Sequence, residues 1–102
     1  MIKKIFISLL VMGFSSSLFA HSALMNCFDN GDETVTCEGG FSDGSSANGV
    51  KFAIVQNGKS IISGKFGEDS SYTFKKPNGT YEAHLDAGEG HKVVVKSKDI
   101  AE

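Results

Sequence analysis

The chain has 102 residues, with ten lysines, no arginine, twelve acidic residues and a formal net charge of −2 at pH 7. This length is enough for one small domain. An excess of acids over bases disfavours binding to nucleic acid or to an anionic membrane surface, so we expect neither partner.

The first twenty residues have the order of a secretory signal peptide. Two lysines precede an apolar stretch over residues 5–14, and a short serine-containing segment ends at Ala20. A transmembrane anchor is the alternative, but the apolar stretch is about half of the roughly 20 residues that a membrane helix needs. We therefore expect cleavage after Ala20 and a soluble periplasmic protein, residues 21–102, that begins at His21, forms a single domain and has no membrane span.

The two cysteines, Cys27 and Cys37, lie in the part that we expect to be exported, where an oxidising compartment lets thiols pair. The two strand-like segments around them, residues 23–28 and 34–37, are separated by the turn-forming residues 29–33, which predicts a β-hairpin. We therefore predict a disulfide that crosslinks the hairpin. The alternative is a pair of thiolate metal ligands, but the spacing is not typical of zinc sites.

Turn-forming residues, among them the dipeptide Asn57–Gly58, interrupt the rest of the chain at short intervals. The segments between them are rich in β-branched and aromatic residues, several with alternating apolar and polar positions. Together with the first hairpin they make seven short strands and predict an all-β fold, a small antiparallel β-sandwich of the transthyretin-like or immunoglobulin-like kind. The strands expected after the hairpin are residues 50–55, 60–66, 72–75, 81–85 and 92–96.

The sequence has no P-loop and no dinucleotide-binding fingerprint, and no cysteine nucleophile remains once the two cysteines are paired. The adjacent carboxylates of Glu68 and Asp69 fall in a predicted turn, where acids are usually solvated. We therefore expect that the protein is not an enzyme.

The three histidines are the candidate metal ligands, because histidine is the commonest protein ligand for borderline transition metals. If cleavage follows Ala20, His21 offers both a free α-amine and an imidazole, a chelate that suits Cu(II) or Ni(II). The alternative is an ordinary polar residue at a frayed terminus. Met25 could add a thioether to a Cu(I) site, although a methionine in a strand usually belongs to the core.

The second candidate ligand, His91, follows a glycine-bracketed turn that also carries Asp86 and Glu89. A loop that presents an imidazole beside two carboxylates is a plausible site. His84 would share one strand face with Glu82 and Asp86, because side chains alternate along a strand. This face is either an ordinary solvent face or the flank of a metal site.

Short glycine-containing stretches recur along residues 39–95, and the closing stretch 86–91, Asp-Ala-Gly-Glu-Gly-His, is the most specific of them. The other glycine-containing stretches are residues 40–44, 48–50, 57–59, 64–65 and 79–81, and a further stretch, Tyr-Thr-Phe at residues 72–74, has no glycine. In these stretches the chain resembles the small periplasmic or extracellular proteins associated with ECF-type nickel and cobalt uptake transporters. The domain of those proteins is similar to the carboxypeptidase-regulatory, transthyretin-like β-sandwich. Members of the group tend to begin, once processed, with a histidine, as this chain would with His21.

The resemblance implies a non-enzymatic periplasmic protein that binds nickel or cobalt and presents it to a membrane-embedded uptake transporter. His21 would supply an amine and an imidazole, His91 a further nitrogen, and Asp86 or Glu89 weak or outer ligands, with His84 as a further candidate. Two alternatives stay open. One is a metal-free interaction module that uses a sheet edge or the Gly/Ser loop, residues 42–49. The other is a copper-handling protein, because Cu(II) outranks nickel at nitrogen sites.

Overall fold

The computed structural model describes residues 22–101, whose regular elements are strands and one short 3₁₀ helix. The predicted signal peptide with its cleavage site, and His21, lie outside the described residues. The elements are β1 (Ala23–Asp29), β2 (Thr34–Phe41), β3 (Lys51–Gln56), β4 (Lys59–Lys65), β5 (Ser71–Lys75), β6 (Glu82–Asp86), β7 (Lys92–Lys96) and η1 (Ser97–Asp99).

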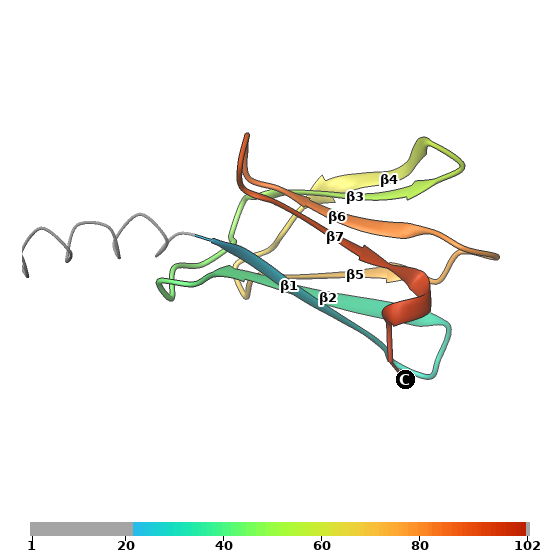
Figure 1. Ribbon diagram of the computed structural model, residues 1–102. Helices are drawn as coiled ribbons and strands as arrows, with labels where there is room; N and C mark the ends of the chain where they lie inside the picture. Colours follow the sequence, from blue (N-terminus) through green and yellow to red (C-terminus); the bar gives the residue numbers. More distant parts are fainter. Residues whose placement is uncertain (1–21, 102) are drawn as a thin grey trace, which may run out of the picture.

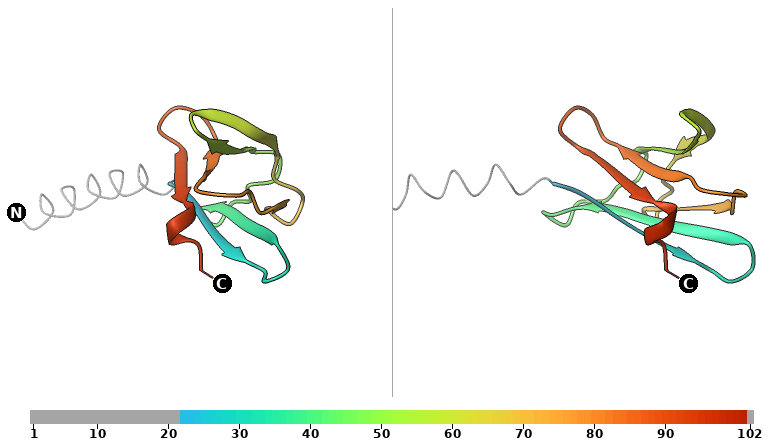
Figure 2. Two further views of the ribbon diagram at one scale, coloured as in Figure 1. Left: turned by 90° about the vertical axis from the view of Figure 1, so that its right-hand side faces the viewer. Right: turned by 45° about the vertical axis from the view of Figure 1, so that its right-hand side comes forward.

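The strands form two sheets that pack face to face (Figure 1, Figure 2). Sheet A has three strands in the order β1-β2-β5, and sheet B has four in the order β4-β3-β6-β7. All paired strands are antiparallel. The prediction of an all-β, seven-stranded antiparallel sandwich is therefore confirmed.

Each predicted strand is present, and the largest difference in length occurs in β2. This strand was expected to end near Cys37 but continues to Phe41, because its last residues pair with the start of β1, Gly39 opposite Met25 and Phe41 opposite Ala23. Two consecutive glycines at positions 39 and 40 weaken the strand signal in the sequence.

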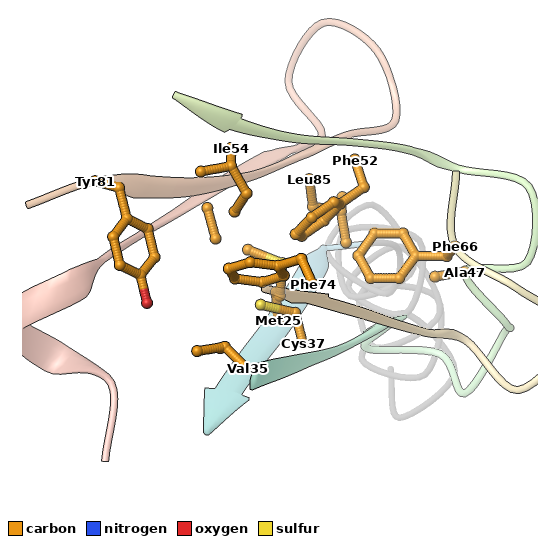
Figure 3. Close-up of a cluster of buried hydrophobic side chains, with 11 residues drawn as sticks. Met25, Val35, Cys37, Ala47, Phe52, Ile54, Phe66, Phe74, Tyr81 and Leu85 are labelled. Carbon is orange, nitrogen blue, oxygen red and sulfur yellow. The ribbon is translucent and has the colours of Figure 1, made fainter. Parts of the chain in front are cut away.

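The core lies between the two sheets and consists of aromatic and aliphatic side chains from both (Figure 3). The Phe52 ring from β3 lies at its centre, stacked on Tyr72 with ring centroids 4.4 Å apart. Phe66 and Phe74 contact the same ring at centroid distances of 5.3 Å and 5.7 Å. Because Phe52 belongs to sheet B whereas Tyr72 and Phe74 belong to sheet A, this aromatic cluster joins the sheets.

The first hairpin carries the predicted disulfide between Cys27 of β1 and Cys37 of β2, which are direct cross-strand partners. Neither cysteine is therefore a free thiolate. At the far end of the same hairpin, Lys76 Nζ donates a hydrogen bond to Asp29 Oδ2 at 2.7 Å, and the Gly31 N–H donates one to Oδ1 at 2.8 Å. These two bonds hold the pKa of Asp29 below its usual value.

The strands β1 and β7 lie side by side along one edge of the sandwich and run in the same direction (Figure 1). Beyond β7, the chain turns through η1 and forms a parallel bridge between Phe28 and Ala101. There the Asp29 N–H donates a hydrogen bond to the Ala101 carbonyl at 2.7 Å. This contact fixes the relative position of the two strands.

Candidate functional site

His91 is held in place by the backbone of the β6–β7 turn. The Ala87 N–H donates a hydrogen bond to the His91 carbonyl at 2.9 Å, and the His91 N–H donates one to the Gly88 carbonyl at 2.9 Å. Gly88 and Gly90 have φ angles of +111° and +80°, which favour glycine. The glycine bracketing of this turn in the sequence therefore reflects a backbone requirement.

The His91 imidazole has an unusual environment for a histidine in a surface turn. Its Nδ1 atom is buried and has no hydrogen-bond partner among residues 22–101. A buried ring nitrogen without a partner is unfavourable. Among the candidate metal ligands that the structure describes, it is the one side-chain atom that is buried without a hydrogen-bond partner.

The two carboxylates of the turn have different environments. The Gly88 N–H donates a hydrogen bond to Asp86 Oδ1 at 3.0 Å, so this carboxylate stabilises the turn itself. Glu89 lies exposed at the tip, between the two glycines.

His84 lies on the opposite face of sheet B from the core. Its neighbours along β6, Ala83 and Leu85, are fully buried, so alternation turns His84 outward. There its Nε2 atom lies 3.0 Å from Glu82 Oε1, in hydrogen-bond contact, which agrees with the shared face predicted from the sequence. His84 is thus hydrogen-bonded to a neighbour on the outer face of sheet B. His91 lies two positions before Val93, which packs against the core, so the alternation of side chains places His91 on the inner side of the sheet.

Within residues 22–101, no three His, Cys, Asp or Glu side chains are grouped so that they could hold a metal ion. The expected additional ligands His84, Asp86 and Glu89 do not gather around His91. Met25 is buried, with 8% of its surface exposed, and packs in the core between the sheets. Of the two principal ligands expected from the sequence, the structure describes only His91.

The start of β1 lies at the same end of the sandwich as the β6–β7 turn (Figure 1, Figure 2). Ser22, the first described residue, is attached there to the Gly/Ser loop: its N–H donates to Ser42 Oγ at 3.0 Å, and its carbonyl accepts from the Ser42 N–H at 2.9 Å. The first described residue therefore lies at the end of the sandwich that carries the β6–β7 turn.

A second feature was not anticipated from the sequence. A groove of about 530 Å³ runs over the outer face of sheet B beside His84. Its lining includes Ala53, Val55 and Val94, together with Lys51 and Lys92. The sequence carries a partial signal, because lysines occupy the first and last positions of β7, which lie on one face of the strand. The groove itself depends on which strands are neighbours.

No protein-family model, no curated protein sequence and no solved structure matches this chain. In the range 22–101, no helix is long and apolar enough to cross a membrane.

Proposed function

We propose that this protein is a non-enzymatic periplasmic accessory protein of metal uptake, which binds a divalent transition metal and presents it to a membrane-embedded transporter. Nickel or cobalt is the proposed metal. The ligands are the α-amine and imidazole of His21, exposed by cleavage after Ala20, and the imidazole of His91. Export is consistent with the Cys27–Cys37 disulfide, because disulfides persist in oxidising compartments.

The observation that carries the proposal is the juxtaposition of the β1 and β7 starts at one end of the sandwich. In the sequence, His21 lies two residues before β1 and His91 directly before β7, and these two strands are neighbours that run in the same direction. The buried Nδ1 of His91, which has no partner within residues 22–101, adds support, because a metal ion or a protonated neighbour would satisfy it.

The test is native mass spectrometry of the protein purified after export of the full chain, with and without Ni(II). We expect a mass that begins at His21, is two hydrogens lighter than the reduced chain, and gains one nickel ion. His21→Ala and His91→Ala should each abolish nickel retention.

His84→Ala is the matched control, because it removes an imidazole from the opposite face of the same sheet. It should leave nickel retention unchanged. The proposed ligand set would be excluded if nickel is retained after the loss of either His21 or His91. It would also be excluded if the processed protein does not bind nickel. Circular dichroism of each variant distinguishes loss of a ligand from loss of the fold.

A further inference from the structure

The lysines of sheet B gather on its outer face, the face turned away from the core. The alternating neighbours of these positions, such as Phe52 and Leu85, are buried, so the lysines point outward. Cross-strand pairing arranges the outward positions in three rows. The rows are Lys65, Lys51, Asp86 and Lys92; then Ser63, Ala53, His84 and Val94; then Val55, Glu82 and Lys96.

The middle row forms the apolar floor of the groove, and the charged rows lie on either side of it. Ala53 and Val94 flank His84, and Val94 is 48% exposed, which is unusual for a valine in the middle of a strand. The groove thus offers apolar contact that no residue of the described chain covers.

The charge of this face is opposite to that of the rest of the molecule. It carries four lysines (Lys51, Lys65, Lys92 and Lys96) and two carboxylates, and Glu82 is already in contact with His84. None of the four lysines forms an ion pair within residues 22–101. By contrast, residues 22–49 and 66–80, which contain sheet A and its loops, carry seven acids and two lysines.

We propose that the outer face of sheet B is a docking surface for an acidic protein segment with one apolar side chain. The apolar side chain would lie on Ala53 and Val94 in the groove. Its acidic neighbours would face Lys51, Lys65 and Lys92 on one side of the groove and Lys96 on the other. Complementary charge at the rim steers association and fixes register, while the apolar floor supplies the contact area. This surface is independent of the proposed metal site at the end of the sandwich.

Other occupants fit the surface less well. A symmetric pairing of two copies through this face would bring lysines against lysines, which is unfavourable. An anionic lipid surface is uniformly negative, whereas this face places Asp86 between Lys51 and Lys92 and so favours a partner with charges at defined positions. The edge strand β4 is a poor alternative, because lysines at both ends and a bulge in its pairing with β3 protect it from strand addition.

The test is nuclear magnetic resonance of the isotope-labelled exported protein, titrated with the capped peptide Asp-Glu-Leu-Asp-Glu. We expect shifts of the backbone amides of β3, β6 and β7, and loss of these shifts at high salt because the rim charges are screened. A peptide with serine in place of leucine should bind more weakly. The double variant Lys51→Gln/Lys92→Gln should not respond at the peptide concentration that saturates the parent protein.

The matched control is Lys75→Gln/Lys98→Gln, which removes the same number of charges away from the groove and should behave as the parent. The proposal is overturned if the peptide shifts sheet A instead, or if both double variants lose binding equally. It is also overturned if vesicles of anionic lipid produce the same shifts as the peptide, or if the shifts appear on raising the protein concentration alone. Those two results would identify a membrane or a second copy as the occupant.

Discussion

Gly39 in β2 occupies a position that has no room for a side chain. An ideal Cβ atom built there would lie 2.8 Å from Leu85 Cδ1 and 3.1 Å from both Ala47 Cβ and Phe66 Cζ. These neighbours are buried and cannot move aside freely. We therefore expect Gly39→Ala to lower the free energy of unfolding by about 1–3 kcal/mol, measured by urea denaturation.

The adjacent Gly40 provides the control for this prediction. Its ideal Cβ would meet only the Ser45 carbonyl oxygen at 3.8 Å, an ordinary contact. Gly40→Ala should be neutral or stabilise the fold by up to about 1 kcal/mol, because alanine restricts the unfolded chain. Equal losses in the two variants would mean that backbone conformation, rather than contact with the opposite sheet, requires glycine here.

At the scale of single residues, a conformation can be predicted from the sequence where neighbouring residues in the chain determine it. The Asn57–Gly58 turn was predicted from its dipeptide, and both residues have positive φ angles, 54° and 78°. The requirement for Gly39 could not be predicted, because the atoms that exclude its side chain belong to residues 85, 47 and 66. These residues meet Gly39 only when the two sheets pack together.

The first hairpin is the element most dependent on a covalent bond. Within the sheets, β1 pairs with β2 alone, and the disulfide joins the two strands at Cys27 and Cys37. The bridge spans a sequence separation of 10, and closing a loop of that size restricts the unfolded chain. We expect Cys27→Ala/Cys37→Ala to lose about 2–3 kcal/mol of stability in urea denaturation.

Reduction of the parent protein by dithiothreitol supplies an independent measurement, because it breaks the bond without changing the sequence. The reduced parent and the double variant should have similar unfolding midpoints, both below that of the oxidised protein. A double variant as stable as the oxidised protein would show that strand pairing and core packing alone hold β1 in place.

The strands were predictable because their signal is periodic and their turns are rich in glycine and asparagine. Alternation also predicted correctly that His84 and Glu82 share a face, where they now form a hydrogen bond. The surroundings of His84 were not predictable, because they depend on β6 lying between β3 and β7. That order brings Lys51 and Lys92, far apart in the sequence, to either side of Asp86.

At the scale of the whole molecule, the two sheets are held together by side-chain packing. Among the described residues, no strand of sheet A pairs with a strand of sheet B, and the aromatic cluster around Phe52 spans the interface. Removal of a buried aromatic ring costs about 3–5 kcal/mol. A domain of this size has a total stability of only about 4–12 kcal/mol. We therefore expect Phe52→Ala to weaken or abolish the fold in urea denaturation.

The milder variant Phe52→Leu keeps the protein folded enough to ask whether the sheets unfold together. Because the ring contacts Tyr72 and Phe74 of sheet A, its loss should speed amide hydrogen exchange in β2 as well as in β3 and β6. Val94→Ala on the outer face should change stability by no more than about 0.5 kcal/mol. Faster exchange confined to sheet B would contradict this prediction, because sheet A would then be stable without the shared core.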